Sequence, residues 1–151
     1  MKVLPQTGRL AGVDYGTVRI GISLSDPGQR FASPLETHPR GNAQQEERWI
    51  AKLVAEHQIV GFVVGLPIHT NGRESEKSRE ARLFAAWLEQ QTGVPVQLYD
   101  ERYTTVEAES ILIQAGSTRR KRKEQRDKLA AQILLQSFLE STRRTDLDAI
   151  D

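Results

Sequence analysis

The first third of the chain alternates apolar and polar positions in the manner of β-strands. Arg9 to Asp14 is largely apolar and ends at Tyr15-Gly16. Arg19 to Ser25 places its branched aliphatic residues on one face and its small residues on the other, a period of two that predicts a half-buried strand. Phe31 to Thr37 predicts a third strand, and Pro34 within it favours a sheet edge. The short connections between the three predict antiparallel hairpins.

The rest of the chain alternates helical and strand-like patterns. Asn42 and Gln45 match a capping box, and helical spacing of apolar residues continues to His57. Ile59 to Val64 is a continuous run rich in β-branched residues, which is typical of a central strand covered on both faces. The remaining predicted elements are a helix over Glu74 to Thr92 ended by Gly93, a strand over Val94 to Tyr99, a helix from Thr104 to Gly116, and a last helix over about Lys121 to Thr142.

The order of these elements is β-β-β-α-β-α-β-α-α, which predicts an α/β fold. We expect a five-stranded mixed sheet, with three antiparallel strands followed by βαβ units, flanked by helices on both faces. The 151 residues are enough for one hydrophobic core, and no internal repeat or linker divides them. Residues 1–151 are therefore expected to form a single domain, with a tail that frays from about Arg143.

Composition excludes several classes of chemistry. The chain has no cysteine, so disulfides, thiolate zinc sites and cysteine nucleophiles are excluded. Its three histidines lie far apart in the sequence, so a bound metal would be held mainly by oxygen. The first ten residues contain no signal peptide, and the longest nearly apolar run, Ile59 to Ile68, is half the length of a membrane span. We therefore expect a soluble cytoplasmic protein.

Acidic residues stand at the ends of two predicted strands. Asp14 ends the first strand, where it either caps the turn or faces a ligand. Asp100-Glu101 follows the strand that ends at Tyr99, and ligands of α/β sheets bind beyond the carboxyl ends of strands. If the two strands lie close in the sheet, these acids converge. Asp100 or Glu101 could instead pair with Arg102 or charge the start of the next helix.

Asp127 lies on an apolar helix face. Ala130, Ala131, Leu134 and Phe138 follow it at helical spacing, so its carboxylate points towards the sheet, where it needs a cation or a partner. The helix dipole at the first turn is the alternative reason for an acid there. Together the acids suit Mg²⁺ or Mn²⁺, as one or two ions, which activate water for phosphodiester hydrolysis.

The charge of the chain is unevenly distributed. The formal net charge is +1, but residues 119–128 hold seven basic and two acidic residues, a net +5, which leaves −4 for the others. A basic run is often only a solvated loop, but this one leads into Asp127 and would bring phosphate contacts beside the proposed metal. The expected nucleic-acid contacts are Arg102, Thr104, Thr105, Arg119, Arg120, Lys121, Arg122, Lys123, Arg126 and Lys128, although the two threonines also suit helix capping.

Four segments together resemble the YqgF family, also called RuvX, of pre-16S ribosomal RNA nucleases. They are Gly12-Val13-Asp14-Tyr15-Gly16-Thr17 with Arg19-Ile20-Gly21-Ile22, Val63-Val64-Gly65-Leu66-Pro67 with Asn71-Gly72, Asp100-Glu101-Arg102 with Thr104-Thr105-Val106-Glu107-Ala108, and Asp127-Lys128 with Ala130-Ala131 and Ile133-Leu134. No single segment is specific, but their order and spacing extend from residue 9 to about 139.

The resemblance implies an RNase H-like fold related to Holliday-junction resolvases of the RuvC type. It implies a divalent-metal nuclease that trims the 5′ end of the 16S ribosomal RNA precursor in ribosome biogenesis. Asp14, Glu101 and Asp127 would be the catalytic, metal-binding acids, with Asp100 as a further ligand or base. The loop residues near this site would be Thr17, Arg19, Gly65, Pro67 and Asn71.

Two departures from the family pattern concern the last helix. Arg126 stands where an apolar residue usually precedes the final acid. Ala130 and Ala131 stand where resolvases commonly place a second acid, which favours a one-metal or substrate-completed site over a full two-metal site.

Three other functions remain open on the sequence. The same acids would serve a resolvase acting on branched DNA rather than RNA, and the protein could be a monomer or a homodimer. A non-catalytic nucleic-acid-binding domain is a second alternative. The third is a fragment of an actin-like ATPase, because Asp14 to Thr17 resembles its phosphate loop, although such proteins need two domains of this kind.

Overall fold

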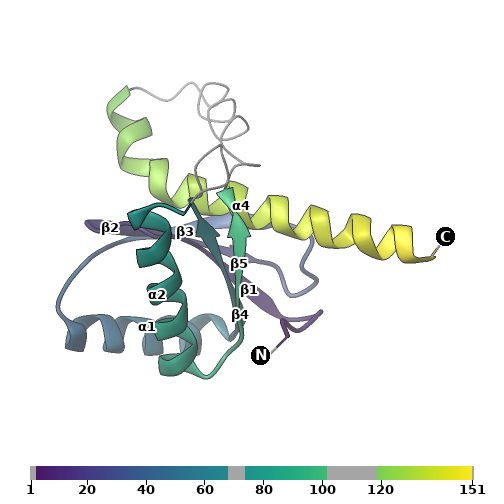
Figure 1. The fold of residues 1–151 in the computed structure, drawn as a ribbon, viewed down its shortest axis with the longest axis horizontal. Coiled ribbons are helices and arrows are strands. Elements are labelled where there is room, and N and C mark those ends of the chain that lie inside the picture. The colour runs from purple at the N-terminus through teal and green to yellow at the C-terminus, as the bar shows by residue number, and fades with distance from the viewer. Residues whose placement is uncertain (1–2, 68–73, 102–118, 151) are drawn as a thin grey trace.

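A computed structural model describes residues 3–67, 74–101 and 119–150 of the chain, with side chains of the last range described for residues 125–141. Its centre is a five-stranded sheet in the order β3-β2-β1-β4-β5 (Figure 1). The strands are β1 (Arg9–Asp14), β2 (Arg19–Ser25), β3 (Ala32–Pro39), β4 (Ile59–Leu66) and β5 (Val96–Asp100). The first three pair antiparallel, and β4 pairs parallel with both β1 and β5. The predicted mixed sheet is confirmed, with the proline-containing β3 at an edge.

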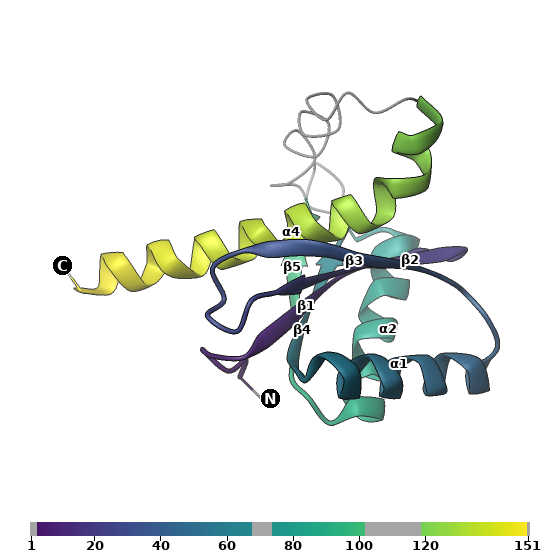
Figure 2. The ribbon, with the colours of Figure 1, turned by 180° about the vertical axis from the view of Figure 1, so that it is seen from behind.

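The helices cover both faces of the sheet, as expected. Helices α1 (Ala43–His57) and α2 (Glu76–Thr92) lie on one face, and α4 (Arg119–Ile150) crosses the other (Figures 1 and 2). The predicted capping box of Asn42 and Gln45 starts α1. Helix α2 begins at Glu76, two residues after the predicted Glu74, with Ser75 as its cap, and Gly93 ends it with a left-handed backbone (φ +74°) that glycine adopts without strain.

The last helix is longer than the sequence pattern predicted. It begins at Arg119 and continues to Ile150, whereas we expected about Lys121 to Thr142 and a frayed tail from Arg143. The segment from Arg143 to Ile150 contains no glycine or proline, so no helix breaker stands where the predicted end lay. The predicted helix from Thr104 to Gly116 lies outside the described residues. Within the described ranges, no helix is both long and apolar enough to cross a membrane.

Each face of the sheet has its own hydrophobic core. Ile50 and Leu53 of α1 and Leu88 of α2 pack on the buried strand residues of one face. Leu135 and Leu139 of α4 pack on the other. The central strands are therefore buried on both sides, as the apolar run over Ile59 to Val64 predicted.

The prediction that Arg19–Ser25 is half-buried was wrong. Ser23 and Ser25, on the face with small side chains, are 0% and 1% exposed. The Ser23 hydroxyl donates a hydrogen bond to the Ala131 carbonyl of α4 at 2.7 Å, so this face lies beneath a helix rather than in water. The small residues allow the helix to approach closely, which a hydrophobicity pattern does not distinguish from exposure.

Candidate active site

Three strands bring their carboxyl ends to one edge of the sheet. Asp14 is the last residue of β1, and Asp100 is the last residue of β5, with Glu101 directly after it. Strand β4 lies between them, with Val64 beside Val13 and Leu66 beside Asp100. The convergence expected for Asp14 and the Asp100-Glu101 pair therefore occurs, because only one strand separates the two.

A glycine brings α4 to the same edge. Gly21 is the antiparallel partner of Asp14, and it lies under the backbone of α4. A Cβ atom at Gly21 would overlap the carbonyl of Asp127 and would come within 2.9 Å of the Lys128 nitrogen. The missing side chain thus allows the helix backbone at Asp127 to rest against the sheet, one strand away from Asp14.

Asp14 and Glu101 form a hydrogen-bonded pair of carboxyl groups. Burial, followed by the charge of Glu101 and the hydrogen bond to it, raises the pKa of Asp14 well above its ordinary value. Burial also raises the pKa of Glu101. Two such groups retain a shared proton more readily than isolated acids, as paired carboxylates do at like-charge sites. Glu101 rests over Gly65, where an added Cβ would come within 2.9 Å of the Glu101 Cγ.

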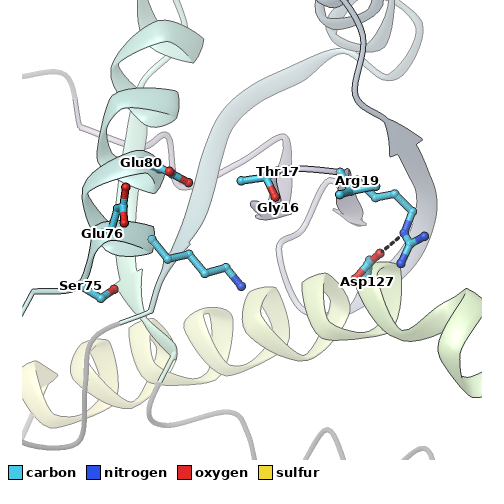
Figure 3. Close-up of a pocket in the computed structure, with 9 residues that line it drawn as sticks. Gly16, Thr17, Arg19, Ser75, Glu76, Glu80 and Asp127 are labelled. Carbon is cyan, nitrogen blue, oxygen red and sulfur yellow. Dashed lines mark hydrogen bonds and ion pairs between the residues drawn. The ribbon is translucent and has the colours of Figure 1, made fainter.

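Asp127 is directed onto an arginine. Its Oδ2 accepts a hydrogen bond from Arg19 Nε at 3.0 Å, between side chains that are 24% and 49% exposed. Figure 3 shows Asp127 on α4 facing Arg19, with Ser75, Glu76 and Glu80 of α2 on the opposite side of the cleft. Asp127 is nevertheless close enough to Asp14 for its negative charge to raise the pKa of Asp14 further. The three expected acids therefore lie together as a hydrogen-bonded pair and a third held by arginine.

The donor set suits an oxygen-seeking divalent cation. Two desolvated carboxyl groups that share a proton can exchange it for a cation, since metal binding requires deprotonated ligands. Mg²⁺ is usually held by one or two carboxylates, with water and substrate phosphates completing its shell. Asp14 and Glu101 supply such a pair. In the part of the chain that the structure describes, no three acids or histidines are grouped to hold an ion, so a third carboxylate would have to come from Asp127 released by Arg19.

A cleft of about 600 Å³ opens beside the acids. It is lined by Thr17 and Arg19, by Ser75, Glu76, Lys77 and Glu80 at the start of α2, and by Asp127. The positive charge of Lys77 lowers the pKa of both Asp14 and Glu101, although less than burial raises it. Basic side chains and the start of a helix are the groups that bind phosphate oxygens in proteins. The cleft therefore offers two basic side chains to an anion, among the three carboxylates of Glu76, Glu80 and Asp127.

Comparison with known proteins identifies the family. The sequence model described as "RuvX: Holliday junction resolvase" matches residues 8–141. The chain belongs to the RuvX family. A relative from Rhodopirellula baltica, named "Putative pre-16S rRNA nuclease", is 52% identical over 139 residues, which cover 92% of this chain and 80% of that one. A relative of the same name from Koribacter versatilis is 40% identical over 133 residues, covering 88% and 87%.

Solved structures confirm the RNase H-like fold expected for a RuvX protein. Thermus thermophilus RuvC, in complex with a Holliday junction substrate, matches with a TM-score of 0.55 at 17% identity and covers 91% of this chain and 97% of that one. The fowlpox virus resolvase, in complex with Holliday junction DNA, matches with a TM-score of 0.56 at 13% identity, covering 89% and 98%. At these identities the likeness concerns the fold alone.

The other residues expected at the RuvX site have several outcomes. Asp100 ends β5, and its charge raises the pKa of Glu101 as the least of the named causes. The Pro67 carbonyl accepts a hydrogen bond from Ser75 Oγ at 3.2 Å, which ties the end of β4 to the start of α2. Arg126 is exposed on α4, and Lys128 is half-buried. Arg119, Arg120, Lys121, Arg122 and Lys123 belong to the first turns of α4, whereas Asn71, Arg102, Thr104 and Thr105 lie outside the described residues.

Sequence reasoning missed two contributors to this site. Lys77 gave no signal because the relation of α2 to the acids depends on how the helix packs on the sheet. Gly21 did give one, since glycine inside a β-strand often marks close approach of another backbone.

Proposed function

We propose that this RuvX protein is a divalent-metal-dependent endonuclease that processes the 5′ end of pre-16S ribosomal RNA during ribosome biogenesis. The observation that carries the proposal is the desolvated, hydrogen-bonded pair of Asp14 and Glu101 at the sheet edge, with Asp127 beside it. The names of the relatives at 52% and 40% identity support RNA as the substrate. We propose that residues 1–151 act as one domain and that the activity is cytoplasmic.

Asp14 and Glu101 would hold the cation, Mg²⁺ or Mn²⁺, as one or two ions. When bound, the cation activates a water molecule and stabilises the charge that develops on the phosphate. Asp127 would join the ligands by leaving Arg19, and Arg19 would then be available to the substrate phosphate. Asp100, next to Glu101, would act as a further ligand or as the base that orients the water.

Basic side chains in and around the cleft would hold the nucleic acid, with the bound cation offsetting the carboxylates that also line it. Lys77 and Arg19 line the cleft, and Arg126 and Lys128 flank Asp127 on α4. The remaining contacts would come from Arg119, Arg120, Lys121, Arg122 and Lys123, with Arg102, Thr104 and Thr105 following β5. Phosphate contacts position a strand without reading its sequence, so these residues set the register of the RNA rather than its identity.

Incubation of precursor 16S RNA with the protein and Mg²⁺ or Mn²⁺ tests the proposal. We expect shortening at the 5′ end that stops in EDTA and in the Asp14→Asn and Glu101→Gln variants. The loss should be at least about 100-fold, because even residues that only support a metal ligand contribute about 10–100-fold. Unchanged cleavage by both variants would contradict the assignment of the site. Salt-sensitive RNA binding without metal-dependent cleavage would favour a non-catalytic nucleic-acid-binding domain.

A resolvase acting on branched DNA is the second candidate, and the description of the matching family model favours it. Competition between a precursor RNA and a four-way DNA junction separates the two substrates. Resolvases cut symmetrically as dimers, so preference for the junction together with a dimer in sedimentation experiments would support the second candidate. Preference for RNA by a monomer would support the first.

A further inference from the structure

A second hollow, which we call the aromatic pocket, lies beside the acids on the α1 and α2 side of the sheet. Its cavity of about 380 Å³ is lined by Tyr15, Arg40, Glu46, Glu80, Phe84 and Trp87, together with Ala43 and Leu83. Tyr15 directly follows Asp14 in the chain. Glu80 lines both this pocket and the cleft that contains Arg19 and Lys77, so the two hollows meet at that residue. A strand whose phosphate occupied the cleft would have the aromatic pocket next to it.

Three aromatic rings form a continuous row in this pocket. The ring centres of Tyr15 and Phe84 are 5.3 Å apart, and those of Phe84 and Trp87 are also 5.3 Å apart. Phe84 is buried, but Tyr15 and Trp87 are only half-buried. Leu83, at the pocket's rim, is 72% exposed. The row therefore has solvent-accessible aromatic surface. In proteins that bind single-stranded nucleic acids, nucleobases stack on such surfaces.

Arg40 is fixed over these rings without bringing free positive charge. Its guanidinium carbon lies 5.3 Å from the centre of the Tyr15 ring and 5.5 Å from that of Phe84. Two of its nitrogens donate hydrogen bonds to Glu46 at 2.8 Å each, and the third donates to the Gly16 carbonyl at 3.0 Å. Because Glu46 balances its charge, the guanidinium acts as a flat, rigid surface rather than as a phosphate-binding group.

Glu80 gives the pocket a preference among planar ligands. Among the described residues it forms no ion pair, so its carboxylate is available as an acceptor at the pocket wall. A carboxylate repels a phosphate but accepts hydrogen bonds from the exocyclic amines that cytosine, adenine and guanine carry and uracil lacks. The pocket as a whole thus favours an uncharged aromatic ring that carries an exocyclic amine.

We propose that the aromatic pocket holds one unpaired nucleobase of the substrate strand, next to the nucleotide whose phosphate lies in the cleft. The base stacks on the exposed surface of the Tyr15, Phe84 and Trp87 row, and Glu80 accepts hydrogen bonds from its edge. This inference rests on the proposed function in one respect only, which is that the ligand is a single-stranded nucleic acid. It adds a site that reads a base, with a base that carries an exocyclic amine preferred over uracil.

Fluorescence of Trp87 tests the pocket without requiring cleavage. The chain has two tryptophans, and Trp49 is stacked on His38 with ring centres 3.7 Å apart. In a Trp49→Phe protein, Trp87 is the sole tryptophan reporter. We expect titration with a short single-stranded oligocytidylate in EDTA to quench this emission, and an oligonucleotide of the same length made only of abasic sugar-phosphates to leave it unchanged. Equal responses to the two probes would overturn the proposal.

Variants of the full-length protein separate stacking from folding. Trp87→Ala should weaken oligocytidylate binding about tenfold, within the range of stacking on one aromatic side chain, and Trp87→Phe should recover most of the loss. Phe31→Ala is the matched control, because Phe31 is 67% exposed in the connection between β2 and β3 and does not line the pocket. Glu80→Gln should reduce the preference for oligocytidylate over oligouridylate. Unchanged affinity and preference in both Trp87→Ala and Glu80→Gln would overturn the proposal.

Two further outcomes distinguish this inference from the proposed function. Quenching by RNA in a protein that cleaves no substrate would support the pocket while contradicting the nuclease. Metal-dependent cleavage that proceeds with normal affinity in Trp87→Ala would do the opposite. If Leu83→Glu abolished self-association of the protein but left RNA binding intact, the pocket would be part of a protein interface, and the proposal would be wrong.

Discussion

The two faces of the sheet are packed by different means. On the α4 face, β1 and β2 present small residues, and a Cβ atom at Gly12 would come within 2.8 Å of the Ala131 carbonyl oxygen. On the other face, β1 presents Val13 and β2 presents Ile20 and Ile22, which pack with the large side chains of α1 and α2. On the α4 face, helix backbone thus lies against the sheet at Gly12 and Gly21, next to a side-chain core around Leu135, whereas the other face is packed by side chains throughout.

This difference determines what each face can do. A helix held by backbone contact has little freedom to shift, so α4 fixes the position of Asp127 beside Asp14. Side-chain packing tolerates adjustment better, and along the middle of α2 it leaves the hollow that Tyr15, Phe84 and Trp87 line. We infer that the α4 face positions the acids, while the α1 and α2 face supplies stability and a surface for ligand.

The substitution Gly21→Ala should disturb the packing of α4 on the sheet more than any other change proposed below. The added Cβ would overlap the backbone of Asp127, so α4 must move away from the sheet. We expect the free energy of unfolding to fall by about 3 kcal/mol, at the upper end of overpacking costs. Cleavage should fall about 100-fold or more, because a displacement of about 1 Å at a reacting group has effects of that size. Urea unfolding and a cleavage assay measure the two losses.

Leu88→Ala is the matched control on the opposite face. Leu88 is fully buried, so its truncation should lower the free energy of unfolding by about 2–5 kcal/mol. Cleavage should survive under conditions in which the variant is folded, since Leu88 positions no acid. Equal loss of cleavage in both variants would show that general destabilisation, rather than the seating of α4, explains the result.

Asp14→Asn should increase stability while it removes activity. The raised pKa of Asp14 means that the folded protein binds a proton that the unfolded chain releases, so stability falls as pH rises from the ordinary aspartate pKa through the raised one. Asparagine cannot lose that proton. In EDTA at neutral pH we expect the variant to be more stable by about 1 kcal/mol, as for other single stabilising substitutions.

Thermal unfolding across a pH series in EDTA measures this effect. The gain of Asp14→Asn over the unsubstituted protein should be largest at neutral pH and should vanish at pH values below the ordinary aspartate pKa. A gain that grew towards acid pH would contradict the direction assigned to the pKa of Asp14.

Ser23→Ala should have a smaller effect on the α4 face. The Ser23 hydroxyl is buried and donates to the Ala131 carbonyl at 2.7 Å. Its loss should lower the free energy of unfolding by about 1 kcal/mol, the usual net value of one hydrogen bond. Urea unfolding of this variant beside Ser33→Ala, at an exposed position of β3, checks the prediction. Equal stability of the two variants would mean that the hydroxyl does not help to hold the helix.

Arg19→Gln should have the smallest effect on stability. Its ion pair with Asp127 is partly exposed, so the unfolding free energy should change by less than about 1 kcal/mol. Release of Asp127 should tighten Mn²⁺ binding by up to about fivefold, which is equivalent to about 1 kcal/mol. Titration of free Mn²⁺ by electron paramagnetic resonance measures this. Lys52→Gln, which breaks the surface pair with Glu56 on α1, should leave the affinity unchanged.

The elements of the fold were predictable where one residue pattern has one cause. The β-branched run over Ile59 to Val64 is buried on both faces, and Pro34 lies in an edge strand, as their chemistry requires. The alternation in β2 led to a wrong prediction of its burial. Small residues on one face of a strand are found both where that face is exposed to water and where it contacts a helix. Only the position of α4, which follows β2 by about a hundred residues in the chain, decides between them.

The site was predictable to a similar extent. Asp14 and Glu101 stand at the ends of apolar strands, so the rule for the carboxyl ends of strands predicted that they would lie at one edge of the sheet. The pairing of Arg19 with Asp127 joins side chains 108 positions apart and depends on how closely α4 meets β2 at Gly21. No local sequence pattern encodes a contact between residues so far apart in the chain. Lys77 could not be predicted for the same reason, because its position relative to the acids depends on the packing of α2.

Anomalous scattering from a crystal grown with Mn²⁺ tests the central claim most directly, because it locates the ion without reference to activity. We predict a peak bonded to the carboxylates of Asp14 and Glu101, with Asp127 turned from Arg19 towards it, and no such peak in the Asp14→Asn variant. A crystal saturated with Mn²⁺ that showed no peak between Asp14 and Glu101 would contradict the account.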